Sequence, residues 1–181
     1  MKKILVLILS ITLLQSCIIS TAAKAVKGVA TVGYKAVKGT VKGVSWAVGK
    51  AKGKIDEDRI DGTWKVVGVY RGSFADFEKD PNPESSFTTS CTAGFDQMVF
   101  HTKRSRFKPV HCSRTDEKWI KYDFKFGKNP ATNERENYIE YSKNNYISVI
   151  DVNSKTMVLE GNLMPELSFS TNTVYLLEQV K

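Results

Sequence analysis

After residue 55, the sequence consists of short segments in which apolar and polar residues alternate. In residues 119–126, for example, Ile120, Tyr122 and Phe124 alternate with charged residues. Alternation with a period of two places the apolar side chains on one face of a β-strand, whereas a helix repeats every 3.6 residues. No long segment with helical periodicity follows residue 55. The sequence therefore predicts an all-β domain over residues 55–181.

Eight segments of this kind are predicted, and turn-forming residues separate them. The predicted strands cover residues 62–70, 95–101, 106–112, 119–126, 138–142, 146–151, 157–162 and 173–180. Eight antiparallel strands joined in chain order can close into an up-and-down barrel, which leaves no exposed strand edge. We therefore predict an eight-stranded antiparallel up-and-down barrel, with a β-sandwich as the alternative.

The N-terminus has the order of parts found in an export signal. Lys2 and Lys3 precede an apolar run over residues 4–14, and these eleven residues are too few to span a bilayer as a helix. Residues 14–17 read Leu-Gln-Ser-Cys, which resembles the lipobox of bacterial lipoproteins. A signal-anchor helix with an incidental cysteine is the alternative interpretation.

The lipobox resemblance implies a processed and lipidated N-terminus. Residues 1–16 would be a signal peptide that is removed, and Cys17 would carry diacylglycerol and a further fatty acid such as palmitate. Because Ile18 rather than aspartate follows Cys17, the resemblance favours the outer membrane over the inner membrane. The mature protein would then face the periplasm or the cell exterior, where disulfides persist.

Basic residues are concentrated in residues 17–54. This segment contains eight lysines and no acidic residue, whereas residues 55–181 have a net charge of −2. The formal net charge of +8 therefore comes from the N-terminal region rather than from the predicted barrel. A basic isoelectric point of this origin does not indicate a nucleic-acid-binding domain, and we predict no nucleic-acid partner.

Residues 17–54 also contain an eleven-residue repeat, because Lys-Ala-Val-Lys-Gly occurs at residues 24–28 and again at 35–39. The repeat is similar to those of the synucleins, which form amphipathic helices on anionic lipid. Three interpretations remain: a flexible tether, an interfacial helix, or helix association through Gly39 and Gly43. In the second, the residues at the membrane surface are Lys24, Lys27, Lys35, Lys38, Lys42 and Trp46.

Two cysteines remain after the lipobox cysteine is set aside. In an oxidising compartment, Cys91 and Cys112 are predicted to form a disulfide, which stabilises the fold by roughly 3 kcal/mol for a loop of this length. The alternative is a metal or redox site that also uses His101 and His111. Because the C-x₂-C and H-x₃-H spacings of common metal sites are absent from the sequence, we predict no metal and no cofactor.

Residues 62–64 read Gly-Thr-Trp at the start of the first predicted strand. This Gly-x-Trp motif, followed by the eight-strand pattern, resembles the lipocalins and the bacterial lipocalin-like lipoproteins. The resemblance implies that Trp64 packs across the closed end of the barrel and that the barrel binds a small hydrophobic ligand. The residues that would line the cavity are Phe100, Tyr122, Phe124, Tyr141 and Ile147.

The alternative is that the same residues fill the barrel. The protein would then act through its surface as an envelope interaction module, for example as an accessory, secretion partner or inhibitor. Residues 72–94 are predicted to form a loop or lid at the barrel mouth. Lys103, Arg104, Arg106 and Lys108 form a basic cluster that is either a solvated hairpin tip or a contact for lipid phosphates, lipopolysaccharide or an acidic partner.

Catalytic motifs are lacking in the sequence, which contains no G-x-S-x-G, H-E-x-x-H, P-loop or G-x-G-x-x-G element. We therefore predict that the protein is not an enzyme. The predicted organisation is a signal peptide over residues 1–16, a lipidated tether or interfacial helix over residues 17–54, and a lipocalin-like barrel over residues 55–181.

Overall fold

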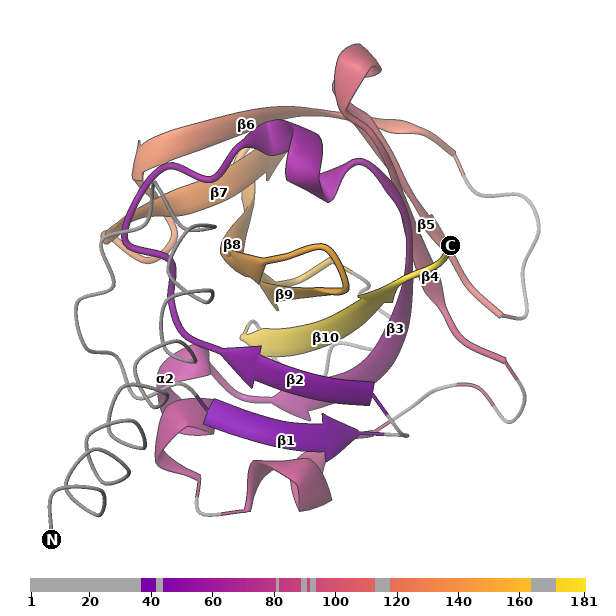
Figure 1. Cartoon of the computed structure of the whole chain (residues 1–181). Helices are drawn as coiled ribbons and strands as arrows, with labels where there is room; N and C mark the ends of the chain where they lie inside the picture. Colours follow the sequence, from indigo (N-terminus) through magenta and orange to yellow (C-terminus); the bar gives the residue numbers. More distant parts are fainter. Residues whose placement is uncertain are drawn as a thin grey trace, which may run out of the picture. The chain divides into compact units, whose positions relative to one another are not determined.

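The computed structural model describes residues 37–41, 44–80, 82–88, 91, 94–112, 118–163 and 172–181. Eight of its strands form a closed antiparallel barrel in which each strand pairs with its neighbours in the chain and the last pairs with the first (Figure 1). The barrel strands are β3 (Gly62–Arg71), β4 (Gln97–His101), β5 (Arg106–Val110), β6 (Ile120–Lys128), β7 (Arg135–Tyr141), β8 (Asn145–Val152), β9 (Thr156–Gly161) and β10 (Thr173–Gln179). The predicted fold class and the eight-stranded up-and-down barrel are confirmed.

Strand pairing places the alternating apolar residues on the inside of the barrel. Between β6 and β7, Tyr122 lies opposite Tyr141 and Phe124 lies opposite Ile139. Directly paired residues point to the same face of a sheet, and all four belong to the interior apolar cluster. The face predicted from the alternation in residues 119–126 is therefore the buried face.

One end of the barrel is closed by the chain that leads into β3. The short 3₁₀ helix η1 (Glu57–Ile60) lies there, and Ile60 is fully buried. The Nε1–H of Trp64 donates to the carbonyl oxygen of Ile60 at 2.9 Å. The main-chain N–H of Ile55 donates to Oδ1 of Asn137, also at this end, at 2.8 Å. Trp64 thus fastens the closing segment to the first barrel strand.

A second layer covers part of the outside of the barrel (Figure 1). It consists of the hairpin β1 (Val37–Val41) and β2 (Val44–Val48), the helix α2 (Phe74–Lys79) and the 3₁₀ helix η2 (Pro83–Ser86). Apolar residues from the hairpin, α2, β3, β8, β9 and β10 form a second core cluster. Its buried members are Trp46, Val48, Val67, Tyr70, Phe74, Phe77, Ile150, Val158, Val174 and Leu176.

The β1–β2 hairpin contradicts the predictions for the described part of residues 17–54. Val37–Val41 and Val44–Val48 are strands rather than a flexible tether or a helix. Trp46 is buried rather than placed at a membrane surface, with 4% of its surface exposed. The Trp46 ring packs 5.3 Å from Phe77, measured between ring centroids. Gly39 does not mediate helix association. Instead, a Cβ atom there would lie 1.9 Å from Oε1 of Glu84, which accepts a hydrogen bond from the main-chain N–H of Thr40.

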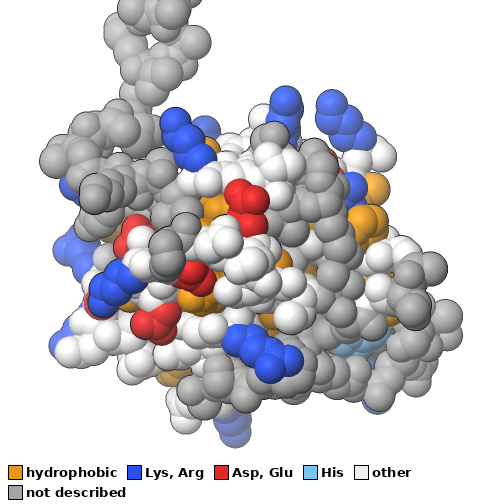
Figure 2. All heavy atoms as spheres, turned by 90° about the horizontal axis from the view of Figure 1, so that it is seen from below, with side chains coloured by type: hydrophobic (Ala, Val, Ile, Leu, Met, Phe, Trp, Pro, Cys, Tyr) orange, Lys and Arg blue, Asp and Glu red, His pale blue; other side chains and the backbone are white. Residues whose placement is uncertain are grey.

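The predicted lid is also corrected. Residues 72–94 contain α2 and η2, which dock on the outside of the barrel, and Phe74, Phe77 and Phe87 pack in the outer cluster. Helix α2 begins with a capping box between Ser73 and Asp76. Figure 2 views this side of the molecule and shows apolar side chains only in small areas among polar and charged ones.

Several predictions concern residues outside the described part of the chain. These are the signal peptide over residues 1–16, the lipidation of Cys17, and the membrane-surface roles of Lys24, Lys27, Lys35 and Lys42. Lys38 is described and is exposed on β1. Within the described residues, no helix has the length and apolar character needed to cross a membrane.

Candidate functional site

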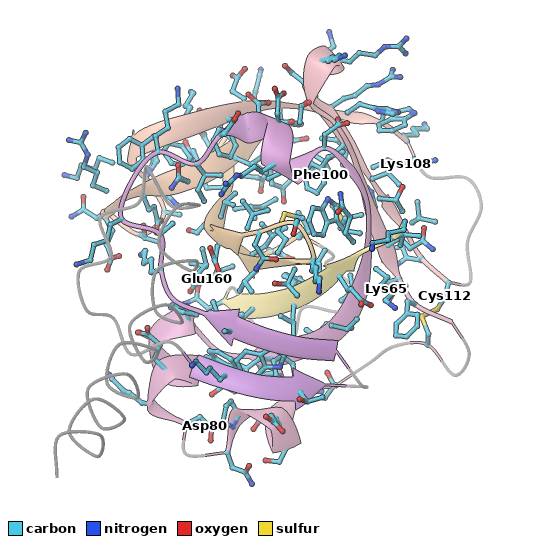
Figure 3. The ribbon with its side chains drawn as sticks, in the orientation of Figure 1. Lys65, Asp80, Phe100, Lys108, Cys112 and Glu160 are labelled. Carbon is cyan, nitrogen blue, oxygen red and sulfur yellow. A yellow bond between two sulfur atoms is a disulfide. The ribbon has the colours of Figure 1, made fainter. Side chains whose placement is uncertain are left out.

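The five residues predicted to line a ligand cavity are brought together inside the barrel. Phe100, Tyr122 and Ile147 are buried members of the interior cluster, and Phe124 and Tyr141 are partly buried against it. Figure 3 shows Phe100 inside the ring of strands. The five residues therefore face the barrel interior, as the alternation predicted.

Aromatic side chains pack against one another in this interior. The ring centroid of Phe107 lies 5.7 Å from that of Phe100, 6.1 Å from that of Tyr122 and 5.4 Å from that of Tyr141. A side chain that lined a ligand-sized void would expose part of its surface to that void. Instead, the largest interior side chains are fully buried, namely Trp64, Met98, Phe100, Phe107, Ile139, Ile147, Met157, Leu159 and Tyr175. The barrel centre is filled by its own side chains.

Two of the interior tyrosines, Tyr122 and Tyr141, donate hydrogen bonds through their hydroxyl groups. The hydroxyl of Tyr122 donates to Oε1 of Glu57 at 2.9 Å, and that of Tyr141 donates to the carbonyl oxygen of Asn162 at 2.8 Å. Burial raises the pKa of both tyrosines, and the adjacent Glu57 carboxylate raises that of Tyr122 further. Both hydroxyls therefore stay protonated and fix the packing of the interior.

The outer face of β4 and β5 carries a different arrangement, in which cationic side chains gather around one indole ring. The His101 ring stacks on Trp119 with 4.7 Å between centroids. Cζ of Arg106 lies 4.5 Å from the Trp119 centroid, and Nζ of Lys108 lies 5.3 Å from it. We define the Trp119 surface as His101, Lys103, Arg104, Arg106, Lys108 and Trp119.

Strand register builds the Trp119 surface. His101 of β4 pairs with Arg106 of β5, and Lys108 pairs with Val99. Lys103 and Arg104 lie in the 3₁₀ helix η3 (Thr102–Arg104) that connects the two strands, and both are exposed. In Figure 3, Lys108 lies on the outer side of β5. The sequence identified the four basic residues of this hairpin, but not the contribution of His101 and Trp119.

A buried polar network fastens the chain that follows the β1–β2 hairpin to the barrel. Nζ of Lys50 lies 2.7 Å from Oε2 of Glu136, whose side chain is 2% exposed, and it also pairs with Glu134. Oε1 of Glu136 accepts hydrogen bonds from Asn129 at 2.7 Å, Thr132 at 2.6 Å and Ser148 at 2.8 Å. Lys50, Asn129, Thr132 and Ser148 all donate to the carboxylate of Glu136. The network therefore holds the segment after β2 against the barrel.

Hydrogen bonds within the network keep both Glu136 and Lys50 ionised. Burial opposes ionisation of Glu136, but the hydrogen bonds from Lys50, Thr132, Ser148 and Asn129 outweigh it and lower the pKa. Burial also opposes the charge of Lys50, but its hydrogen bonds to Glu134 and Glu136 outweigh this and raise the pKa of Lys50. The ion pair therefore persists at neutral pH.

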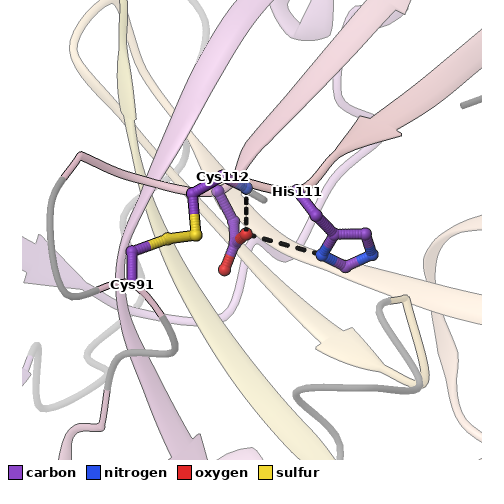
Figure 4. Close-up of a disulfide and its surroundings, with 4 residues drawn as sticks. Cys91, His111 and Cys112 are labelled. Atoms are coloured by element: carbon purple, nitrogen blue, oxygen red, sulfur yellow. Dashed lines mark hydrogen bonds and ion pairs between the residues drawn. A yellow bond between two sulfur atoms is a disulfide. The ribbon is translucent and has the colours of Figure 1, made fainter. Parts of the chain in front are cut away.

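The predicted disulfide between Cys91 and Cys112 is confirmed, with 6.1 Å between the Cα atoms (Figure 4). The carboxylate of Asp96 lies beside it and is buried. Oδ1 of Asp96 accepts from the main-chain N–H of Cys112 at 3.0 Å and lies 3.4 Å from Nδ1 of His111. The other histidine, His101, stacks on Trp119 instead.

Comparison of the chain with models of protein families, with characterised proteins and with solved structures found no significant match.

Proposed function

We propose that this protein is a lipid-anchored lipoprotein of the bacterial cell envelope, whose filled lipocalin-like barrel is a rigid interaction module. Its Trp119 surface binds phosphate-bearing headgroups of an anionic membrane. The observation that carries the proposal is the clustering of cations around Trp119 on a barrel whose interior is occupied by its own side chains.

The chemistry of the Trp119 surface suits this role. Arginine and lysine near an anionic bilayer contribute about 1 kcal/mol each to binding. Tryptophan favours the interface between headgroups and hydrocarbon because its ring is apolar and its N–H is polar. Lys103 and Arg104 are exposed, and Trp119 and Lys108 are half-buried, so all four present atoms to a partner.

The N-terminal anchor would keep the barrel close to such a membrane. If Cys17 is lipidated, residues 18–36 separate the anchor from the first residue of β1. Fully extended, the chain from Cys17 to Val37 spans at most about 70 Å. The Trp119 surface would therefore stay at a high local concentration of headgroups, and modest affinity would suffice.

Vesicle binding tests the proposal. A chain of residues 18–181 without acyl groups is mixed with vesicles of phosphatidylglycerol or phosphatidylcholine, and the bound fraction is measured by sedimentation. The triple variant Lys103→Ala, Arg104→Ala, Lys108→Ala is expected to bind phosphatidylglycerol at least about tenfold more weakly, because three cations are lost. Binding by the unaltered chain should fall at high salt and be absent with phosphatidylcholine.

The matched control removes three exposed lysines elsewhere, through Lys79→Ala, Lys155→Ala and Lys181→Ala. It has the same net charge as the first triple variant and retains the basic N-terminal segment. Its affinity is expected to stay near that of the unaltered chain. Equal losses in the two triple variants would show that net charge alone governs binding, and the Trp119 surface would have no specific role.

A second candidate function is transport of a small apolar ligand, which the partial exposure of the interior residues Phe124 and Tyr141 favours. Native mass spectrometry with lipid extraction distinguishes the two functions. For the filled barrel we expect the mass of the protein without a bound ligand. Because of the disulfide, this mass is two hydrogens below that of the reduced sequence. A reproducible apolar compound released from the purified protein would instead establish a carrier and name its ligand class.

A further inference from the structure

The structure points to a metal site that is hidden by the disulfide. We infer that reduction of the Cys91–Cys112 bond creates a site for a thiophilic divalent cation such as Zn²⁺, with Cys91, Cys112, Asp96 and His111 as ligands. This inference does not depend on the proposed function, because its residues lie outside the Trp119 surface and the barrel interior.

The ligand atoms are already close together. The two Sγ atoms and a carboxylate oxygen of Asp96 all lie within 4.8 Å of one another. Around a tetrahedral Zn²⁺ with its usual bond lengths, ligand atoms are separated by about 3.4–3.8 Å. Once the S–S bond is broken, the two sulfur atoms must separate, and each distance from a sulfur atom to the carboxylate oxygen must shorten by at most about 1.4 Å. Rotation about side-chain bonds can supply these movements.

Asp96 is held in position independently of the sulfur atoms (Figure 4). Its side chain is 4% exposed, and Oδ1 accepts a hydrogen bond from the main-chain N–H of Cys112. Its carbonyl oxygen accepts from the main-chain N–H of Val66 in β3 at 2.7 Å. A carboxylate fixed to the barrel beside two cysteines is a prepared hard ligand in a site of otherwise soft donors.

His111 supplies the fourth donor. Its Nδ1 lies 3.4 Å from Oδ1 of Asp96. The imidazole lies outside the group of atoms that are all within 4.8 Å of one another, so it must rotate toward the sulfur atoms to bind the same ion. Two thiolates, one carboxylate and one neutral imidazole would carry a charge of −3 and leave a net charge of −1 with Zn²⁺ bound. Cys112 is exposed, so a reductant and a cation can reach the site from solvent.

The chemistry balances with a dithiol as the reductant. The disulfide accepts two electrons and two protons from the dithiol, which becomes a cyclic disulfide, and Cys91 and Cys112 become thiols. The two thiols then bind one Zn²⁺ through their sulfur atoms and release two protons. Oxidation of the two thiolates would expel the cation, so the redox state of this pair would control metal occupancy.

Cobalt binding to the full chain in detergent tests the inference. The protein is reduced with a water-soluble phosphine, which leaves no competing thiol, and is then titrated with Co²⁺ as the probe. We expect thiolate-to-cobalt charge-transfer absorption only after reduction, with about one ion per chain, and loss of this absorption when Zn²⁺ is added. Cys91→Ser and Cys112→Ser should each abolish the two-thiolate spectrum.

Paired variants identify the other ligands. Asp96→Asn and His111→Ala are each expected to weaken cobalt binding at least about tenfold. The controls His101→Ala and Cys17→Ser should leave the spectrum and the affinity unchanged. Far-ultraviolet circular dichroism follows folding throughout. Reduced protein that stays folded without the thiolate absorption would overturn the inference, as would unfolding on reduction or equal effects of His101→Ala and His111→Ala.

Discussion

Replacing Trp64 with alanine is expected to lower the free energy of unfolding by about 4 kcal/mol. Trp64 is fully buried in the interior cluster, so its removal leaves a large cavity that the closed barrel cannot collapse to fill. The same change removes the hydrogen bond to the carbonyl oxygen of Ile60, which holds η1 over the barrel end. Trp64→Ala therefore removes both the packing of the barrel interior and the hydrogen bond that holds η1 over the barrel end.

Denaturant unfolding followed by circular dichroism measures this effect. Trp64→Phe is expected to have an intermediate effect, because it keeps most of the apolar volume and removes only the N–H donor. Trp119→Ala is the matched control at an exterior position, and about 1 kcal/mol or less is expected there. If Trp64→Ala and Trp119→Ala cost the same, Trp64 would not be the residue that closes the barrel.

Replacing Lys50 with methionine is expected to cost about 3 kcal/mol, at the lower end of the range for a broken buried ion pair because Lys50 is partly exposed. The buried Glu136 carboxylate would lose its cation while keeping its neutral hydrogen-bond donors. The control is Lys125→Met, which breaks the more exposed pair with Glu140 and should cost clearly less than Lys50→Met.

The cost of Lys50→Met should depend on pH in a defined way. The pKa of Glu136 is lowered, so its stabilisation is complete above the ordinary glutamate value of 4.5 and is lost as the pH falls through the lowered value. The pKa of Lys50 is raised, so its stabilisation is complete below 10.5 and is lost as the pH rises through the raised value. The difference between the two proteins should be largest between these limits and narrow outside them.

Unfolding measured across this pH range checks the prediction. A constant difference from acid to alkaline pH would mean that Lys50 contributes through its methylene groups rather than through its charge. A difference that equals that of Lys125→Met would remove the special role of the buried network.

The barrel was predictable because its signal is local. Alternation in segments such as residues 119–126 sets the face of each strand, and the antiparallel order follows from short connections. The β1–β2 hairpin was not predictable in this way. Its eleven-residue period fits a helix, and the strands form where Trp46 can pack against Phe77 and Phe87 from a distant segment.

In the candidate sites too, local patterns predicted some features, whereas others depend on contacts between distant segments. The disulfide followed from counting cysteines, and the inward positions of Phe100 and Ile147 followed from alternation. Whether such residues leave a cavity depends on how their volumes combine across eight strands, which no local pattern contains. The position of Trp119 beside Arg106, and of Asp96 beside Cys112, depends on strand register in the same way.

The docked hairpin determines how a mechanical load would enter the domain. Tension along the N-terminal chain reaches β1 first. The hairpin is attached to the barrel largely through side-chain packing, whereas every barrel strand is bonded to neighbours on both sides. Among the described elements, we therefore expect the hairpin to detach before any barrel strand. Such a detachment would lengthen the chain between an N-terminal attachment point and the barrel without breaking a barrel strand pair.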